Sequence, residues 1–579
     1  MCGIWAILGT GYDPIEHDKE FMKIAGRGPD LTVISRLAPN LWFGFHRLAI
    51  VQPGDVPSAQ PIVGYGLSVV CNGEIYNHER LKAQSPLGND PVNVMNGGSD
   101  CAAIIHAFRF YRSDLSRCCA SLDGVFAFLM VDENYLYVGR DPIGVRPLFY
   151  GITKEGFVFG SEVKCIEKLC ERVDYFPPGC CAQISLGNPQ DRLNIQQYYR
   201  LPISATPKDQ AMSMLHAQEI IRNLLIDSVE KRLMGNRLFG FMLSGGLDSS
   251  LIASIASRFL QAMGQQPIAF SVGFEDSSDL ESARRVAKHL NIPHKILIVT
   301  PEECIACVSD VVYTLETFDP LVIRCGVLHF LLCKYIASSS DVKVLLSGEG
   351  ADELFGSYAY MQRAPTHAQL HHEIIRRLKL LHQYDVLRCD RPTSCHGLEI
   401  RVPFLDKKFI DLVARLPPSY KLMENKKEKH ILRSAFTGWL PEEVLWREKE
   451  GFSEALGKIN LGEVLLEHAN KLITEEQFAQ RNKLFPFKTP EDKEEFWYRA
   501  LFEQFFEINK IESLIHTKVY RTAAWHVRAE LTNPHHPPLQ HQNSDDKESS
   551  DSQQLLPVED EETRFRRRST GSAKFSGVA

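Results

Sequence analysis

The sequence lacks several features that define whole classes of protein. No run approaches the about 18–20 consecutive apolar residues that a helix needs to cross a bilayer. The N-terminus has neither the basic stretch nor the long apolar stretch of a secretory signal. Among the 15 cysteines, pairs such as Cys118-Cys119 and Cys180-Cys181 have no metal-ligand spacing, and a disulfide scaffold would be a short secreted chain. We therefore expect a soluble cytoplasmic protein that contacts no membrane and whose thiols are mostly reduced.

Charge and composition are those of an ordinary globular protein. The formal net charge of −7 does not point to a general nucleic-acid partner. Hydrophobic residues make up 44% and charged residues 24%, so a core of normal size can be buried. At about 100–200 residues per domain, 579 residues correspond to about three domains, or to two large domains and a tail.

Residues 2–200 have the pattern of a sheet-rich α+β domain. Short apolar or alternating segments broken by Gly, Pro and Asn predict strands. One helix is predicted over Asp100–Arg112, with Ser99 or Asp100 as its N-cap. Layers of sheet and helix would enclose the core of this domain. The predicted strands include Leu67–Cys71, Val125–Asp132, Leu136–Val138 and Phe157–Gly160.

The pattern changes over residues 213–525. Predicted helices at Ala217–Leu233 and Ser249–Ala262 alternate with apolar strands, which indicates a parallel sheet with helices on both faces. Residues 200–212 form the expected linker. Residues 531–579 form a tail that is too polar to order itself, so we predict that it is disordered. The predicted strands include Phe239–Leu243, Pro267–Val272 and Val342–Leu346.

A cysteine stands second in the chain. Removal of Met1 would give Cys2 a free α-amine, whose pKa of about 7.7–8.0 lets it relay protons near neutral pH. A thiol beside such a base parallels the known pairing of a threonine with its terminal amine. The alternative is a buried cysteine that happens to be second, and position alone does not decide between the two.

Three further segments favour the nucleophile. They are Phe45–Val51, Cys71–Asn77 and Gly97–Cys101. With Cys2 they resemble the class II glutamine amidotransferase family, which has an N-terminal-nucleophile fold. In that family the cysteine attacks the side-chain amide of glutamine and releases ammonia. The resemblance implies that glutamine contacts Arg47, Leu48, Ala49, Ile50, Val51, Asn72, Gly73, Glu74 and Asp100.

The residue types fit this chemistry. A tetrahedral intermediate needs donors for its oxyanion, and the side-chain amide of Asn72 and the backbone N–H of Gly73 can supply them. Arg47 suits the α-carboxylate of glutamine as a bidentate donor, while Asp100 and Glu74 suit its ammonium group. Each residue alone could be structural, since Asn-Gly is also a common turn. Their occurrence together and in this order favours the functional interpretation.

The strongest single motif is Leu243-Ser244-Gly245-Gly246-Leu247-Asp248-Ser249-Ser250, between a predicted strand and a predicted helix. Backbone N–H groups and the positive helix end would face an anion there, and the glycines let phosphate approach closely. The hydroxyls of Ser244 and Ser249 can donate to phosphate, whereas Asp248 needs an intervening cation and is a candidate Mg²⁺ ligand. No Gly-Lys-Ser/Thr ends the motif, so it is not a Walker loop. It resembles the signature of the ATP pyrophosphatases.

A second strand–loop–helix motif covers Val344–Gly356 and offers Asp352 as another Mg²⁺ ligand. A glutaminase domain followed by a domain of this type resembles the asparagine synthetase family, over residues 1–525. That resemblance implies that ATP, aspartate and glutamine give asparagine, AMP, pyrophosphate and glutamate through β-aspartyl-AMP. Other matching segments are Glu399–Asp406, Lys429–Arg433 and Trp446–Glu450.

The same resemblance implies individual roles in the second domain. Glu349 would assist proton transfer or orientation, and Lys449 would stabilise negative charge. Arg324 would bind a substrate carboxylate or pyrophosphate. A homodimer is expected by analogy with relatives alone. ATP would contact Leu243, Ser244, Gly245, Gly246, Asp248, Ser249, Val272, Ser347 and Gly348.

Three departures from the family pattern leave alternatives open. Gly26 stands in Gly26-Arg27-Gly28-Pro29-Asp30 where a histidine is usual, and two threonines usual after Asp319 are absent. Residues 451–455 lack the usual Asp-Gly pair. The acceptor could therefore be a different carboxylate. A catalytically inactive regulatory paralogue is the other alternative, and the retained Cys2, Asn72 and Lys449 argue against it.

Overall fold

The computed structural model describes residues 1–9, 13–51, 59–85, 94–95, 98–202, 206–423, 427–448 and 459–515. Lys449, the segment 451–455 and the predicted tail lie outside the described residues, so their predicted roles are not examined by the structure.

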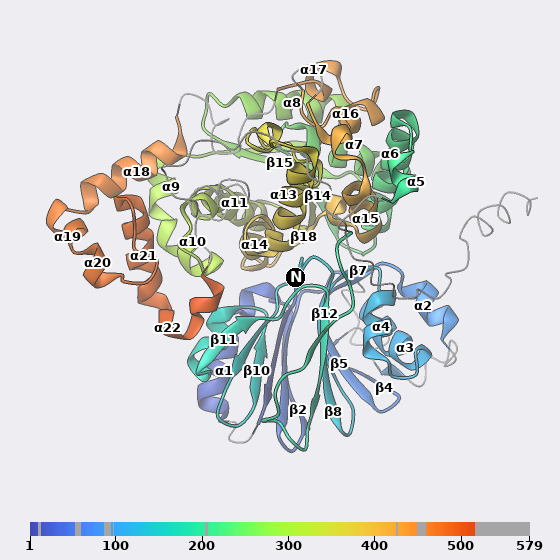
Figure 1. Ribbon diagram of the computed structural model, residues 1–579, viewed down its shortest axis with the longest axis vertical. Coiled ribbons are helices and arrows are strands. Elements are labelled where there is room, and N and C mark those ends of the chain that lie inside the picture. Colours follow the sequence, from blue (N-terminus) through green and yellow to red (C-terminus); the bar gives the residue numbers. More distant parts are fainter. Residues whose placement is uncertain are drawn as a thin grey trace, which may run out of the picture. The chain divides into compact units, whose positions relative to one another are not determined.

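The N-terminal part contains two antiparallel sheets (Figure 1). Alternate residues of a strand in each sheet, such as Ile4 and Ala6 or Ala127 and Leu129, enter one shared buried cluster, so the sheets pack face to face. The six-stranded sheet has the order β11 (Arg172–Tyr175), β9 (Phe149–Ile152), β10 (Phe157–Gly160), β1 (Gly3–Leu8), β3 (Leu41–Arg47) and β2 (Leu31–Ala38). The seven-stranded sheet has the order β13 (Ile195–Gln197), β12 (Cys180–Ser185), β8 (Tyr135–Arg140), β7 (Gly124–Val131), β5 (Leu67–Ile75), β4 (Ile62–Gly64) and β6 (Val94–Met95).

Helices cover the outer face of the seven-stranded sheet. The other alternate set of β7, including Phe126 and Phe128, packs with residues of α3 (Ala103–Phe110) and α4 (Leu115–Ser121). On the six-stranded sheet, Trp5 stacks on Phe21 of α1 (Pro14–Met22). The strands therefore alternate between the inner core and a helix-covered face, which confirms that this part combines sheets with helices.

Two predicted boundaries in this part need correction. Strand β5 continues through Ile75, so Asn72, Gly73 and Glu74 lie inside the strand and not in a turn after it. A Cβ at Gly73 would lie 2.1 Å from the carbonyl oxygen of Val125, so glycine permits the close pairing of β5 with β7. The predicted helix begins as a 3₁₀ turn at Asp100–Ala102, and the Ser99 hydroxyl caps it by accepting from the N–H of Cys101 at 3.2 Å.

The second part contains the parallel sheet that the strand–helix alternation predicted. Its strand pairs are all parallel, and helices α7 (Leu247–Ala262), α8 (Ser278–Leu290) and α11 (Pro320–Ser339) pack against them. The other helices used below are α6 (Met214–Lys231), α12 (Ala351–Phe355) and α14 (Asp385–Ser394). The strand order is β16 (His294–Ile298), β15 (Ile268–Gly273), β14 (Leu238–Met242), β17 (Val342–Leu346) and β18 (Glu399–Arg401).

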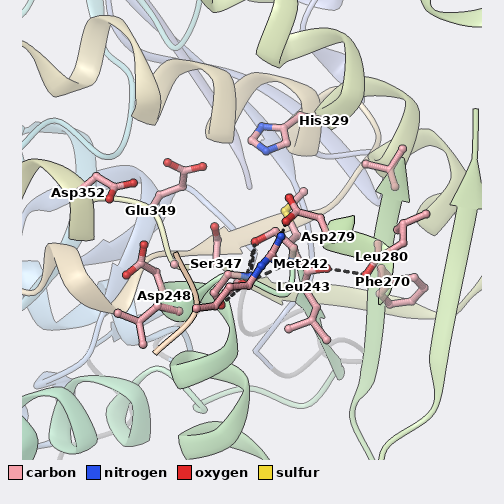
Figure 2. Close-up of a pocket in the computed structure, with 18 of the residues that line it drawn as sticks. Met242, Leu243, Asp248, Phe270, Asp279, Leu280, His329, Ser347, Glu349 and Asp352 are labelled. Atoms are coloured by element: carbon pink, nitrogen blue, oxygen red, sulfur yellow. Dashed lines mark hydrogen bonds and ion pairs between the residues drawn. The ribbon is translucent and has the colours of Figure 1, made fainter. Parts of the chain in front are cut away.

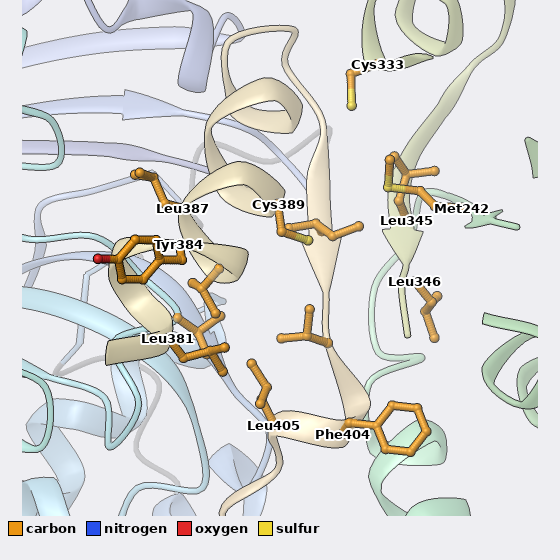
Figure 3. Packing of buried hydrophobic residues seen from close by; sticks show 14 of the residues in the cluster. Met242, Cys333, Leu345, Leu346, Leu381, Tyr384, Leu387, Cys389, Phe404 and Leu405 are labelled. Atoms are coloured by element: carbon orange, nitrogen blue, oxygen red, sulfur yellow. The ribbon is translucent and has the colours of Figure 1, made fainter. Parts of the chain in front are cut away.

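The strand order reverses between β14 and β17. From β14 the chain proceeds outward to β15 and β16, and it then returns to form β17 and β18 on the other side. Ligands of open parallel sheets bind outside the carboxyl ends of the strands at such a reversal. A continuous apolar core supports this edge. Figure 3 shows side chains of this cluster, among them Cys389 of α14 and Met242 and Leu345 from the two central strands.

Helix α11 corrects the expectation that no segment is long and apolar enough to cross a membrane. By length and composition Pro320–Ser339 meets that criterion. However, 61% of its most apolar window is buried inside the protein. Its apolar side chains therefore pack in the core, against neighbours that include α10 (Val308–Leu315), α14 and β15.

Candidate active sites

Cys2 lies immediately before β1 and beside the predicted glutamine-contacting segment. The backbone N–H of Leu48 donates to Cys2 Sγ at 3.4 Å, and Arg27 Nε donates to the carbonyl oxygen of Cys2 at 3.0 Å. Burial raises the pKa of the Cys2 thiol to about 11. With Met1 attached, the nitrogen of Cys2 is a peptide nitrogen, so the predicted base arises only when Met1 is removed. Met1 is buried here, and its ammonium group donates to the carbonyl oxygen of Leu398 at 3.1 Å.

Asn72 carries a buried amide with no protein partner. The residue is 0% exposed, and neither Oδ1 nor Nδ2 has a hydrogen-bond partner. Leaving a buried polar group unsatisfied costs about 1–3 kcal/mol, and such groups in folded proteins call for an explanation such as a ligand. Asn72 is on β5, which contacts β1, the strand that follows Cys2. The orphaned amide is the strongest structural sign of a ligand site in this part.

Two buried carboxylates adjoin Asn72 in the fold. Asp100 accepts from the N–H of Ile75 at 2.7 Å, which fixes the helix turn against β5. Glu74 Oε1 lies 3.6 Å from Nη2 of Arg401. Burial, together with Glu399 and Asp100, raises the pKa of Glu74 well above its usual range. The structure thus brings together Asn72, Glu74 and Asp100, as predicted for the glutamine pocket.

The segment Arg47–Val51 is held by residues that sequence reasoning did not single out. Asp30 donates its N–H to the carbonyl oxygen of Arg47 at 3.0 Å, and its carboxylate accepts from the N–H of Ala49 at 2.7 Å. Arg237, from the second part, donates to the carbonyl oxygen of Ala49 at 2.8 Å. Leu48, Ala49 and Ile50 are buried, while Arg47 and Val51 are half-buried.

Gly26, which replaces a usual histidine, has a packing explanation. A Cβ at this position would lie 2.6 Å from the carbonyl oxygen of Cys395. The adjacent Arg27 is buried and donates from Nη1 to Asp390 at 2.9 Å, to Ser394 at 2.9 Å and to Glu162 at 2.6 Å. The absent side chain lets this arginine reach α14, while its Nε holds the carbonyl group of Cys2.

We expect Gly26→Ala to lower the free energy of unfolding by about 1–3 kcal/mol, because the added methyl group overpacks a backbone contact. The measurement is the thermal unfolding midpoint. Gly187→Ala is the matched control, since its Cβ would meet only the Ser185 hydroxyl at 3.7 Å, and its effect should stay within about 0.5 kcal/mol. Equal unfolding midpoints for the two variants would show that the backbone at Cys395 moves aside for the added methyl group without loss of stability.

A second candidate site lies at the carboxyl ends of β14 and β17. The Ser244–Ser249 loop leaves β14, and Gly246 caps α7. The hydroxyls of Ser244 and Ser249 lie 3.0 Å apart, and the backbone N–H of Ser244 donates to Ser249 Oγ at 3.2 Å. A Cβ at Gly348, in the loop after β17, would lie 2.6 Å from the backbone nitrogen of Ser249. The two predicted loops therefore touch.

Lys429 joins the two acidic residues predicted as metal ligands. Its side chain is 2% exposed, and Nζ forms ion pairs with both Asp248 and Asp352. These two carboxylates, which are distant in sequence, therefore converge on a single positive charge. The segment containing Lys429 was noted in the sequence, but its contact with both carboxylates was not predicted. Among the described residues, no group of three or more His, Cys, Asp and Glu has the arrangement of a metal site.

One cavity brings the two loops together with side chains from α11 and α14. Figure 2 shows Asp248, Glu349 and Asp352 at one end and Phe270 and Leu280 at the other. Of the predicted ATP-contacting residues, all but Gly245 line it. Burial raises the pKa of Glu349 to about 7, against the opposing effect of Arg388. Lining residues to which the sequence analysis gave no role in the site include His329, Arg388, Lys429, Arg433 and Arg447.

Arg324 is not among the residues that line this cavity. Its Nε and Nη2 form a bidentate pair with Glu494, the first of them at 2.8 Å. The edge of the guanidinium that would grip a substrate carboxylate is therefore already filled by a protein carboxylate. The structure separates this predicted residue from the other predicted residues of the second site.

Comparison with known proteins gives the family. An asparagine synthase family model matches residues 220–370 and 361–532, and a glutamine amidotransferase domain model matches residues 1–178. The glutamine-hydrolysing asparagine synthetase of Asparagus officinalis is 36% identical over 531 residues, covering 88% of this chain and 86% of its own length. That of Homo sapiens is 36% identical over 538 residues, covering 87% of this chain and 94% of its own length.

These matches define a glutamine amidotransferase domain joined to a synthase domain. The six-stranded sheet and the parallel sheet lie within the two matched regions, and so does the seven-stranded sheet apart from β12 and β13. The chain belongs to the glutamine-hydrolysing asparagine synthetase family.

Proposed function

We propose that this chain makes asparagine from aspartate and ATP with glutamine as nitrogen donor, through β-aspartyl-AMP. AMP, pyrophosphate and glutamate are the other products. The observation that carries the proposal is the cavity in which the Ser244–Ser249 loop meets Glu349 and Asp352 at the reversal point of a parallel sheet. Family membership supplies the substrates.

At the first site, within an N-terminal-nucleophile sandwich, Cys2 is the nucleophile. The α-amine freed by loss of Met1 takes the thiol proton as Cys2 attacks the glutamine amide. The Asn72 amide and the Gly73 N–H stabilise the oxyanion, and the orphaned Asn72 amide supports this role. Arg47 and the segment through Val51 hold the α-carboxylate of glutamine. Asp100 and Glu74 hold its ammonium group.

At the second site, the N-terminus of α7 and the hydroxyls of Ser244 and Ser249 hold the phosphates of ATP. Leu243, Val272 and Phe270 give the adenosine an apolar wall. Glu349 moves a proton as ammonia displaces AMP, and Lys449 stabilises the negative charge. Arg324 takes no part, because Glu494 occupies it.

The donor set fits Mg²⁺. Asp248 and Asp352 supply hard oxygen ligands that already converge on one cationic nitrogen, that of Lys429. When bound, Mg²⁺ would neutralise charge on the leaving pyrophosphate. The reaction is placed in the cytosol, in keeping with all 15 cysteines being free thiols. A homodimer remains an expectation by analogy.

The test of acceptor identity is pyrophosphate release with ATP, Mg²⁺ and glutamine, measured with aspartate, with other carboxylates and with none. Release that depends on aspartate supports the proposal. Release that depends on another carboxylate would show that this carboxylate, and not aspartate, is the acceptor. The absence of release with aspartate and with every other carboxylate would point to an inactive paralogue.

We expect ammonia-dependent turnover to rise with pH through about 7. Burial holds the pKa of Glu349 at about 7, so its carboxylate, the form that accepts a proton, predominates only above that pH. The measurement is kcat with glutamine absent and neutral ammonia kept saturating at every pH. A profile that stays flat between about pH 6 and 8 would contradict the assignment of Glu349.

A further inference from the structure

A binding place for the acceptor amino acid is the main gap in the second site. The two usual threonines are absent, and the guanidinium of Arg324 is already paired with the carboxylate of Glu494. Aspartate carries an α-carboxylate, an α-ammonium group and the reacting β-carboxylate. A cation with unused hydrogen-bonding capacity must therefore lie near Glu349, and the cavity contains one.

Arg388 of α14 is that cation. Its Nη1 lies 2.5 Å from the carboxylate of Asp385, and its Nη2 lies 3.3 Å from Oε2 of Glu349. Its Nε is buried and has no hydrogen-bond partner. Nε and Nη2 form the side edge of a guanidinium, the same edge with which Arg324 grips Glu494. In Arg388 this edge has one donor unused and one donor in a long contact.

The other cations that line the cavity are held more closely. Lys429 lies between Asp248 and Asp352, and Arg433 pairs with Glu428. Arg447 pairs with Asp279 at 2.7 Å. Nη2 of Arg388 carries two N–H groups, so it can keep its contact with Glu349 while it donates to a ligand. The capacity to bind a new carboxylate is thus concentrated on Arg388.

His329 of α11 lies beside Arg388 and also lines the cavity. Its Nδ1 lies 3.1 Å from the carbonyl oxygen of Arg388, so Nδ1 carries the proton and Nε2 is the acceptor nitrogen. Burial lowers the pKa of His329 to about 4, which keeps the ring neutral at pH 7. A neutral imidazole with an acceptor nitrogen suits an ammonium group. In the view of Figure 2, His329 lies above the cavity residues, between Glu349 and Asp279.

We propose that Arg388 and His329 form the acceptor subsite, with Nε and Nη2 of Arg388 gripping the α-carboxylate of aspartate and Nε2 of His329 accepting from its α-ammonium. The proposal rests on the proposed function. It leaves the β-carboxylate to face the phosphates held by the Ser244–Ser249 loop. Glu349, already in contact with Arg388, then lies next to the reacting carbon, where ammonia enters.

The test is steady-state pyrophosphate release with ammonium replacing glutamine. Arg388→Gln should raise the KM for aspartate about 10–100-fold, because a charge-assisted bidentate contact is lost, while the KM for ATP stays within about twofold. Arg388→Lys keeps the charge but not the fork, so an intermediate increase is expected. The thermal midpoint and glutaminase turnover of each variant show whether it folds.

Substrate analogues separate the two contacts without relying on a variant's stability. β-Alanine is aspartate without its α-carboxylate, so it cannot make the contact that Arg388→Gln removes. The KM for β-alanine should therefore be nearly the same in Arg388→Gln as in the wild-type protein. Succinate is aspartate without its ammonium group, and His329→Phe should raise the KM for aspartate but not for succinate. Wild-type protein should use both analogues less well than aspartate.

Three results would overturn the subsite. The first is an unchanged KM for aspartate in Arg388→Gln. The second is an increase confined to the KM for ATP, which would place a phosphate on Arg388. The third is an increase in the KM for aspartate that is found in Arg324→Gln and not in Arg388→Gln. All three presuppose a wild-type enzyme that turns over aspartate. Failure of wild-type protein to do so would overturn the proposed function itself, so the two failures are distinguishable.

Discussion

Cys2→Ala is expected to lower the rate of glutamine-dependent synthesis by more than about 10⁴-fold and to leave the rate of ammonia-dependent synthesis unchanged. The thiol is the only group in the first site that forms a covalent bond, and loss of a catalytic nucleophile typically has an effect of this size or larger. The second cavity is lined by none of the first-site residues, so it should still use ammonia from solution. The measurement is asparagine formed per minute with each nitrogen donor.

Cys395→Ala is the matched control, because Cys2 and Cys395 are the two half-buried thiols in a chain whose other cysteines are buried. It should keep both activities. If Cys2→Ala retained glutamine-dependent synthesis, a different nucleophile would operate, and the interpretation of the orphaned Asn72 amide would have to change.

Asp352→Asn should reduce synthesis about 10³-fold with either nitrogen donor while glutaminase turnover persists. Removing one of two converging carboxylates halves the negative charge available to a bound cation, and it removes one partner of Lys429. Asp248 would still pair with Lys429, so the fold should survive. The measurements are pyrophosphate release and glutamate release on the same preparation.

Asp341 provides a control at the opposite end of β17. It is exposed and immediately precedes β17, whereas Asp352 follows the carboxyl end of that strand. Asp341→Asn should match wild type in both assays. Full synthetic activity in Asp352→Asn would remove this residue from the site and leave Asp248 as the remaining predicted ligand.

Much of the fold could be predicted because it follows from local patterns. Alternating and apolar segments gave β10 and β17 with their observed ends, and strand–helix alternation gave the parallel sheet. The end of β5 was missed because Asn72-Gly73 has the composition of a turn. Only the tertiary contact with Val125 shows that a glycine was needed there to let two strands approach.

The candidate sites were predictable where short motifs carry the chemistry. Asp248 and Asp352 each follow a strand at the same edge of the sheet, so their convergence follows from topology. Lys429 was not predictable, because its contact with Asp248 joins residues 181 positions apart. Arg388 and His329 belong to helices in which the sequence analysis identified no motif of a binding site. The pairing of Arg324 with Glu494 was not predictable either, because nothing in the local sequence around Arg324 reveals this partner.

The most direct test of the central claim follows nitrogen. Protein is incubated with aspartate, ATP, Mg²⁺ and glutamine labelled with ¹⁵N in its side-chain amide, and the products are identified by mass. We predict asparagine with the label in its side-chain amide, formed in equal amounts with AMP and pyrophosphate. Labelled ammonia and glutamate without labelled asparagine would contradict the account, since the first site would then work without the second.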